Sequence, residues 1–355
     1  MAKTWCKRNL SMKVNSHNTF DKLQEVILGS MSLSVVDSEP DPRKKYILET
    51  VINDTIEDLD NLENIFKSFD VKVHRPNHEA VDFSQTCNTP YFQTNGHRVP
   101  LTPRDIFFSY EDTIITTPNP DQNRYFEYLA FNDILMYYMN EESHVISMPV
   151  PTLDNSIYSD TENIADFGYY NDSFPMMSAA NFQKYGIDIF YSNYNTINPS
   201  ALRWMKRQLG SKYRWHALGS KVRGHLDACF NILKPGVVAS VLPKSELPDY
   251  FKNWTVITDQ EGFKNRKYND LPEFISEHVQ DDDSADSFLA LNVCCIDQQH
   301  VIVYDTTKSS ILKQIEACGM TPVLATMRHT HFLNQGLSCV TLDTVRDSKL
   351  EDYTQ

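Results

Sequence analysis

Apolar residues recur at helical spacing in four segments of the chain. The longest segment, residues 43–77, predicts a long amphipathic helix followed by a short strand. Helical patterns are also expected over residues 124–140 and 199–210, with Gly210 ending the second. Residues 309–327 predict a helix followed by a strand. The helices are long enough to alternate with strands in an α/β arrangement.

Strands are predicted where apolar or β-branched runs are bounded by turn residues. These runs, several of them hairpins, lie at residues 18–30, 102–118, 187–193, 227–240 and 287–305. Between them, residues 141–175 form a polar, irregular stretch that is too long for an ordinary connector, so we expect it to cover a site. No shift of composition marks a linker. The pattern therefore predicts one continuous α/β domain over residues 1–355, with a strand–helix–strand unit in four or five copies.

A polar pair stands at the start of one predicted strand, in "GHLDACFNILKPGVVAS" (224–240). Residues two apart on a strand face the same side, so His225 and Asp227 are expected side by side at the mouth of an apolar run. Burying such a pair without a partner is costly. The residues alone leave two interpretations open: a hydrogen-bonded surface pair, and a functional pair.

Composition narrows the function classes. The chain is 41% hydrophobic and contains 11 glycines, and neither a P-loop nor a GxGxxG motif is present. A formal net charge of −14 disfavours nucleic acid and anionic membranes as partners, and suits a cationic substrate. No segment approaches a membrane span, and no metal or cofactor is expected.

Cysteine usage and the N-terminal residues bear on the compartment. The chain has 7 cysteines, an odd count whose spacings fit neither a disulfide framework nor a zinc site. The N-terminal residues lack the apolar core of a signal peptide. We therefore expect a reducing, cytoplasmic setting, in which one cysteine could serve as a nucleophile.

Several segments, in order and over almost the whole chain, resemble the arginine amidinotransferase family, which includes glycine amidinotransferase and inosamine-phosphate amidinotransferase. They include "FDKLQEVILG" (20–29), "TPRDIFF" (102–108), "RYFEYLAF" (124–131), "HLDACFNILKPGVV" (225–238), "LNVCCIDQQHVIVYD" (291–305) and "GLSCVTLDTVRDSKLEDY" (336–353). The resemblance implies the pentein fold, a five-bladed α/β propeller of ββαβ modules around a central channel that holds the active site.

The resemblance also implies the chemistry of four residues. Cys339 takes the place of the nucleophile that attacks the guanidinium carbon of arginine, and His225 that of the proton shuttle. Asp227 and Asp105 take the places of the carboxylates that hold the guanidinium. Two carboxylates suit a planar cation that is always charged, and a cation beside the thiol favours the reactive thiolate.

Other positions depart from the family pattern. Ser178 stands where the family has the aspartate that supports the catalytic histidine, whereas Asn181 agrees with the usual pattern. Lys244 stands in place of an arginine that binds the donor's carboxylate, and Asp286 falls near a donor-binding serine. The residue before the nucleophile, usually a histidine, is Ser338.

The resemblance implies that the chain moves the amidino group of L-arginine to a small amine acceptor and releases ornithine. The departures favour an acceptor other than glycine, such as lysine or an amine of toxin or antibiotic biosynthesis. Two alternatives stand beside this function: a guanidine-modifying hydrolase, and a non-catalytic pentein that binds its ligand. Homodimers are common in the family.

Overall fold

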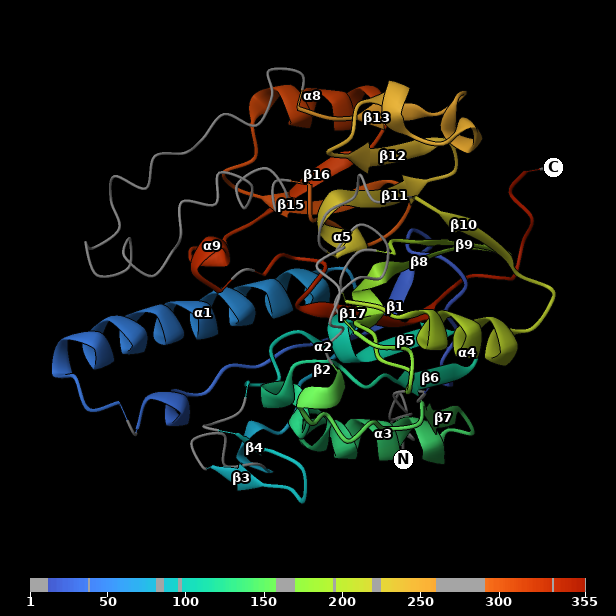
Figure 1. Ribbon diagram of the computed structural model, residues 1–355. Coiled ribbons are helices and arrows are strands. Elements are labelled where there is room, and N and C mark those ends of the chain that lie inside the picture. The colour runs from blue at the N-terminus through green and yellow to red at the C-terminus, as the bar shows by residue number, and fades with distance from the viewer. Residues whose placement is uncertain are drawn as a thin grey trace, which may run out of the picture.

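The computed structural model describes residues 12–37, 39–80, 86–94, 98–157, 170–193, 196–218, 225–259, 291–333 and 335–354. The predicted α/β class is confirmed. None of the helices in these ranges is long and apolar enough to cross a membrane. Helices α1, α3, α4 and α8 lie on the outside, while most of the strands and the short helices α2 and α5 lie towards the middle (Figure 1).

The strands of the described residues form five three-stranded sheets of one common topology, together with a small hairpin of β3 (Cys87–Asn88) and β4 (Gln93–Thr94). In each three-stranded sheet the first two strands are antiparallel and the third is parallel to the second. We call each such sheet, with its connecting segment, a module.

The bounds of the modules follow the chain. The first strand of one module comes from the C-terminal part of the chain, and the other four modules are continuous. The strands are β17 (Thr341–Arg346), β1 (Leu23–Leu28) and β2 (Lys72–His74); β5 (Phe107–Tyr110), β6 (Thr113–Thr116) and β7 (His144–Ser147); β8 (Phe182–Tyr185), β9 (Asp188–Tyr191) and β10 (Arg214–Ala217); β11 (Phe230–Lys234), β12 (Val237–Ser240) and β13 (Thr255–Ile257); and β14 (Cys294–Cys295), β15 (His300–Tyr304) and β16 (Thr321–Ala325).

A helical connection joins the second and third strands of each module. The connections contain α1 (Pro42–Ser68), α3 (Asn132–Asn140), α4 (Pro199–Leu209), the 3₁₀ helices η7 (Lys244–Glu246) and η8 (Asp249–Phe251), and α8 (Ser309–Ala317). In the part of the chain that the structure describes, three more α-helices are single turns: α2 (Pro103–Ile106), α5 (Leu226–Cys229) and α9 (Thr330–Leu333). The remaining 3₁₀ helices are η1 (Leu33–Val36), η2 (His78–Ala80), η3 (Gln122–Arg124), η4 (Glu127–Phe131), η5 (Asn155–Ile157) and η6 (Ala179–Asn181).

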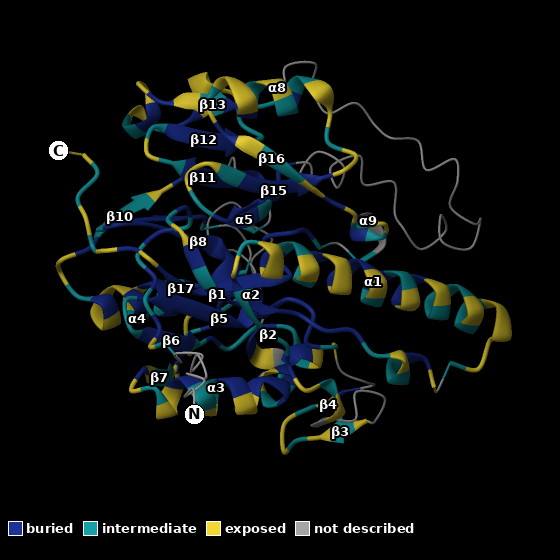
Figure 2. Cartoon of the chain, turned by 180° about the vertical axis from the view of Figure 1, so that it is seen from behind, coloured by how far each residue is buried: buried dark blue, intermediate teal, exposed yellow. Residues whose placement is uncertain are grey.

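Local chemistry explains where the long helix begins. The Asp41 carboxylate accepts the backbone N–H of Arg43 at 2.9 Å, and Pro42 occupies the first turn, where its missing N–H has no partner to lose. The apolar stripe of α1 is buried against the sheets, and its other face is exposed (Figure 2). The expected helix over this segment and the strand after it are confirmed.

Other sequence predictions need correction. The helix expected over 124–140 is broken into η3, η4 and α3. The irregular stretch 141–175 contains the parallel strand β7, whose residues are only partly buried and give no continuous apolar run. Residues 158–169 of that stretch lie outside the described residues, so its predicted role as a cover stays a prediction.

Hydrogen bonds join each module to the next. They link Ser109 to the Asp343 carbonyl, Lys184 to Ser109, Gln183 to Asn231, Cys295 to the Leu233 carbonyl, and Arg346 to the Cys295 carbonyl. Followed in that order, the contacts pass through all five modules and return to the β17–β1–β2 sheet. Among the described residues the sheets are separate. The modules are therefore held together by side chains and by single backbone hydrogen bonds, such as that from the Leu23 N–H to the Ile296 carbonyl at 2.7 Å, rather than by one continuous ladder of strands.

The hairpin between β8 and β9 depends on close packing at a glycine. Gly186 has φ +60°, and a Cβ added there would lie 2.0 Å from the Glu351 carbonyl oxygen. Gly236, in the hairpin between β11 and β12, has φ +79° but open space around its Cα. The two sites share the same backbone requirement and differ in what surrounds them.

We therefore expect Gly186→Ala to lower the free energy of unfolding by about 2 kcal/mol more than Gly236→Ala does. Both substitutions place an alanine in the left-handed backbone region, which is unfavourable, but only the methyl group at position 186 would collide with backbone atoms. Urea denaturation of the two variants measures this difference. Equal losses would show that the C-terminal segment does not pack against this hairpin.

Candidate active site

Four residues singled out from the sequence, together with Asn292, come from equivalent places in different modules. Each lies on a turn directly before the first strand of its module. Asp105 lies in α2, Asn181 in η6, Asp227 in α5, Asn292 just before β14, and Cys339 in the turn before β17. This placement carries side chains from all five modules towards the contacts described below.

The local structure around His225 and Asp227 differs from the prediction. They do not begin a strand: His225 is the N-cap of α5, Asp227 lies within that helical turn, and β11 starts only at Phe230. A single helical turn has no periodicity to distinguish it from the apolar run that follows. The pair lies at the mouth of a buried strand as expected, but strand alternation is not what places it.

The Cys339 thiol is buried in contact with a carboxylate and an amide. Its Sγ donates to Asp227 Oδ2 at 3.3 Å, and Asn292 Nδ2 donates to Sγ at 3.3 Å. Burial raises the pKa of the Cys339 thiol well above its ordinary value, and the negative charges of Asp227 and Asp105 raise it further. The thiol is therefore protonated in this state and needs a nearby cation to ionise.

Asn292 was missed by the sequence analysis. Its side chain also accepts the backbone N–H of Ser338 at 2.6 Å and donates to the Asp227 carbonyl at 3.1 Å, so it joins the nucleophile turn to α5. A Cβ at Gly336 would lie 2.3 Å from Asn292 Cγ, which explains the glycine in this turn. The place of Asn292, just before a β-hairpin as in the other modules, is the signal that could have revealed it.

Asp105 connects the histidine to a buried ion-pair cluster. His225 Nδ1 lies 3.3 Å from Asp105 Oδ1, and Arg124 Nη1 bonds Asp105 Oδ2. Burial alone would raise the pKa of Asp105, but the positive charge of Arg124 and the contact with His225 outweigh it and hold that pKa below its usual range. Asp105 is therefore a carboxylate.

Arg124 is in turn fixed by Glu127, another residue that the sequence analysis did not single out. Arg124 Nε donates to Glu127 Oε2 at 2.6 Å, and Nη2 donates to Oε1 at 2.9 Å, a bidentate pair away from solvent. Two carboxylates share this one guanidinium. Burial raises the pKa of Glu127 to about 7, although Arg124 acts in the opposite direction.

Two carboxylate oxygens at the site lack a hydrogen-bond donor among the described residues. They are Asp105 Oδ1, which has only the nearby His225 ring, and Asp227 Oδ1. Asp105 is 5% exposed and Asp227 is 1% exposed. Buried carboxylate oxygens normally accept hydrogen bonds, so this pair is equipped to receive a ligand that donates N–H groups.

Ser178 is the N-cap of η6 and Asn181 its last residue, and η6 contacts α2 and α5. The Ser178 hydroxyl is buried and makes no hydrogen bond to any described residue, and the histidine contacts Asp105 instead. Asn181 Nδ2 donates to Thr196 Oγ1 at 2.7 Å, and its Oδ1 has no donor among the described residues. Their expected roles at the site stay predictions.

The other two predicted residues stand apart from these contacts. Lys244 is exposed on η7, where its Nζ donates to the Trp254 carbonyl at 2.6 Å. Asp286 lies outside the described residues. Cys294 and Cys295 are buried residues of β14. Within the described ranges, no group of His, Cys, Asp and Glu side chains is arranged to hold a metal ion.

The shared guanidinium predicts a pH dependence. The pKa of Glu127 is raised from 4.5 in the unfolded chain to about 7, so the folded state binds the extra proton between these values. Its contribution to stability is fully present below pH 4.5 and is lost as pH rises through 7. In the Glu127→Gln variant the side chain at this position cannot titrate, so the decrease in the free energy of unfolding with rising pH should be smaller.

The measurement is urea denaturation at pH 5 and pH 8 for the wild type, Glu127→Gln and the exposed control Glu316→Gln. We expect the wild type and Glu316→Gln to lose more stability between these pH values than Glu127→Gln does. A parallel loss in all three proteins would show that Glu127 stays ionised throughout.

Comparison with known proteins supports the resemblance. No family profile matches the chain. Glycine amidinotransferase, mitochondrial, of Danio rerio is 28% identical over 96% of this chain and 84% of its own length. Inosamine-phosphate amidinotransferase 1 of Streptomyces glaucescens is 26% identical over 96% of this chain and 99% of its own length.

The solved structure of an amidinotransferase from Microseira wollei, in the saxitoxin biosynthetic pathway, matches with a TM-score of 0.78 and 25% identity over 96% of this chain and 99% of its own. The resemblance to amidinotransferases predicted from the sequence is confirmed.

Proposed function

We propose that this enzyme, whose relatives transfer amidino groups, moves the amidino group of L-arginine to an amine acceptor through an amidino-cysteine on Cys339. The observation that carries the proposal is the buried thiol beside two carboxylates, Asp105 and Asp227, each with one oxygen that lacks a hydrogen-bond donor among the described residues. A planar guanidinium can donate to both of these oxygens at once.

The charges at the site support a cationic substrate. Asp105 and Glu127 share the single guanidinium of Arg124, and Asp227 adds a further acidic group. Burial raises the pKa of Asp227, and the Asp105 charge raises it further, although His225 and Arg104 act in the opposite direction. A bound guanidinium would relieve this repulsion and favour the ionised form of each carboxylate.

The first half of the reaction begins when the bound cation lowers the pKa of the Cys339 thiol and the thiol proton passes to His225. The thiolate attacks the guanidinium carbon, and a C–S bond forms. The bond from that carbon to the δ-nitrogen of the donor then breaks, and His225 gives its proton to the departing ornithine amine. The amidino group remains on sulfur.

In the second half the acceptor amine attacks the same carbon and the C–S bond breaks. His225 takes the proton that the acceptor nitrogen loses, and the Cys339 sulfur leaves as a thiolate. One imidazole thus serves first as acid and then as base, which suits an exchange in which the first product leaves before the second substrate binds.

The histidine in this mechanism is held by Asp105 rather than by residue 178. The Nδ1 contact with Asp105 supplies a carboxylate for the imidazolium, and Arg124 fixes that carboxylate from its other oxygen. Ser178, without a charge and without a hydrogen bond among the described residues, then contributes packing beside α5. Asp105 would serve both the histidine and the substrate.

The five modules support a five-bladed propeller whose turns before the first strands meet at a central channel. The common topology and the side-chain contacts that run from module to module fit this architecture. We place the whole chain, residues 1–355, in this one domain. A cytoplasmic location and a homodimer stay predictions.

The acceptor is proposed to be an amine other than glycine, either lysine or an amine of toxin or antibiotic biosynthesis. The names of two similar proteins refer to such pathways: one is an inosamine-phosphate amidinotransferase, and the other is an amidinotransferase of saxitoxin biosynthesis. The departures of this chain around the nucleophile support the same inference. Lys244, Asn181 and Asp286 remain proposed contacts of the donor or acceptor.

The nucleophile can be tested with arginine alone. Without an acceptor, arginine should leave the protein heavier by about 42 Da, the mass of an amidino group on sulfur, and the adduct should map to the peptide that contains Cys339. Intact-protein and peptide mass spectrometry measure both. Cys339→Ala should form no adduct. The control Cys229→Ala, which removes a buried thiol at the end of α5, should still form it.

The alternatives give different products in the same experiment. Citrulline with ammonia, or urea with ornithine, in the absence of a guanidinylated amine would identify a hydrolase. Arginine binding without any adduct or turnover, across a panel of amines that includes lysine, would identify a binding protein and contradict the proposal.

The carboxylates make a second prediction. Asp227→Asn and Asp105→Asn each replace a charge that faces the guanidinium, so each should weaken arginine binding by about 10–100-fold, because a hydrogen bond to a charged group contributes about 1.5–3 kcal/mol. Isothermal titration with arginine measures this loss. Asp249→Asn, an exposed aspartate on η8, is the matched control and should bind as the wild type does. Unchanged affinity in the two site variants would mean that the ligand is not held as a guanidinium.

A further inference from the structure

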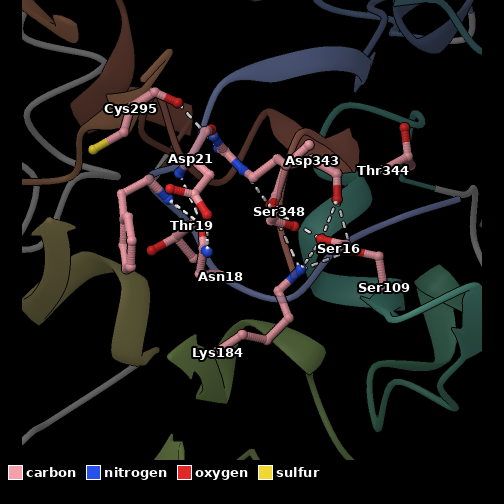
Figure 3. Close-up of polar contacts among 12 residues, drawn as sticks. Ser16, Asn18, Thr19, Asp21, Ser109, Lys184, Cys295, Asp343, Thr344 and Ser348 are labelled. Atoms are coloured by element: carbon pink, nitrogen blue, oxygen red, sulfur yellow. Dashed lines mark hydrogen bonds and ion pairs between the residues drawn. The ribbon is translucent and has the colours of Figure 1, made fainter. Parts of the chain in front are cut away.

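A second charged cluster lies behind the nucleophile turn, and its excess charge is positive. Asp343 on β17 accepts hydrogen bonds from Arg104 Nη2 at 3.0 Å, from Arg346 Nε at 3.0 Å and from Lys184 Nζ at 3.3 Å. Figure 3 shows the Lys184 side chain extending from β8 towards Ser16 and Asp343. We call these four charged residues the basic cluster.

The basic cluster is almost out of contact with water. The exposed fractions of its side chains are 12% for Arg104, 5% for Lys184 and 2% for both Arg346 and Asp343. Asp343 is the only carboxylate paired with these cations among the described residues. Three cations and one anion leave two positive charges uncompensated, and burying such charges is unfavourable.

More distant groups do not remove the excess. The negative charge of Asp227 also acts on Arg104, but counting it still leaves one positive charge. Burial, opposed by Asp343 and assisted by the positive charges of Arg104 and Arg346, lowers the pKa of Lys184 to about 8. The lysine is thus still mostly protonated at neutral pH.

A small cavity adjoins the cluster. It has a volume of about 20 Å³ and is lined by Arg104, Arg346, Asn231, Gln183, Val293 and Ser338, among others. That volume is room for one or two particles the size of a water molecule.

The guanidinium groups at the cavity have donors to spare. Each has five N–H donors. Arg104 makes two hydrogen bonds, to Ser338 O and Asp343, and so keeps three unused donors with respect to the described residues. Arg346 makes three, to Asp343, Asp21 O and Cys295 O, and so keeps two.

We propose that this cavity is a binding site for a small monoatomic anion of the halide class, held between Arg104 and Arg346. A water molecule could accept the unused N–H donors but would leave the excess charge in place. A halide accepts the same donors and reduces the excess from two charges to one. The site is separate from the proposed substrate carboxylates, and it does not depend on the amidinotransferase function.

The anion would stabilise the arrangement of the active site without contacting substrate. Arg104 precedes Asp105 in α2 and donates to the carbonyl of Ser338, the residue before Cys339. Arg104 thus joins the turn that carries Cys339 to the helical turn that carries Asp105. A halide that neutralises part of the charge on Arg104 would stabilise this connection.

The test compares thermal unfolding in sodium chloride, sodium bromide and sodium gluconate at equal ionic strength. Chloride and bromide should raise the unfolding temperature by about 3 °C or more at a concentration 100 times the dissociation constant, and the effect should saturate. Gluconate is too large for the cavity and should not raise it. Identical curves in the three salts would overturn the proposal.

A charge variant and a crystal give independent readouts. Lys184→Met removes one cation, so it should unfold at a higher temperature than the wild type in gluconate and should lose most of the response to chloride. The exposed control Lys252→Met should keep the wild-type response. If Lys184→Met does not fold, crystals of the wild type grown with bromide decide the matter. An anomalous peak between Arg104 and Arg346 supports the site, and density for water alone there contradicts it.

Discussion

The arrangement of the modules depends on the ion pairs that the Asp343 carboxylate makes. It is buried on the strand that follows the nucleophile turn, and it bonds one cation from α2, one from β8 and one from its own strand. Its pKa lies far below the usual range because three positive charges outweigh the cost of burial. Removing this one negative charge would leave three cations facing each other without solvent. The centre of the molecule is therefore held by electrostatics as much as by apolar packing.

Two neighbouring regions near the middle of the molecule, which we call its two levels, carry opposite net charge. On the side of the thiol, acidic groups outnumber the single guanidinium of Arg124, and on the side of β17, cations outnumber Asp343. Arg104 and Asp105 are neighbours in sequence and belong to opposite levels. A one-turn helix can separate adjacent side chains in this way, because successive residues point about 100° apart. The same short helix thus prepares one side for a cation and supplies positive charge to the other.

The sequence predicted the parts of the fold that repeat a pattern over many residues. The stripe on α1 and the apolar hairpins have clear periods, so their type and approximate bounds could be predicted. The single turns α2, α5 and η6 could not, because three or four residues form about one turn and contain no repeat. These turns carry Asp105, Asp227 and Asn181, so the least predictable elements hold the candidate site. Resemblance to a family, rather than periodicity, found these residues.

Two residues of the site could not be found from the sequence, because their role depends on contacts that only the fold creates. Asn292 and Glu127 lie in segments quoted for the resemblance, yet nothing in their one-dimensional context indicates contact with Cys339 or Arg124. Their partners are 47 residues and 3 residues away in the chain, and only the fold gives the distances. The contact between His225 and Asp105 joins residues of two modules, which no local pattern encodes.

The pairing of β17 with β1 determines when the enzyme can become reactive. Leu23 pairs with Arg346, so the sheet that contains β1 is complete only after nearly the whole chain has been synthesised. Cys339 lies just before that last strand, and its turn is held by Asn292 and Arg104 from two other modules. A nascent chain on the ribosome accordingly exposes an unpaired edge of β1 for most of its synthesis, and long-range closure of this kind is slow. The carboxylates that would hold the guanidinium emerge well before the thiol, and the nucleophile is the last chemical group to join them.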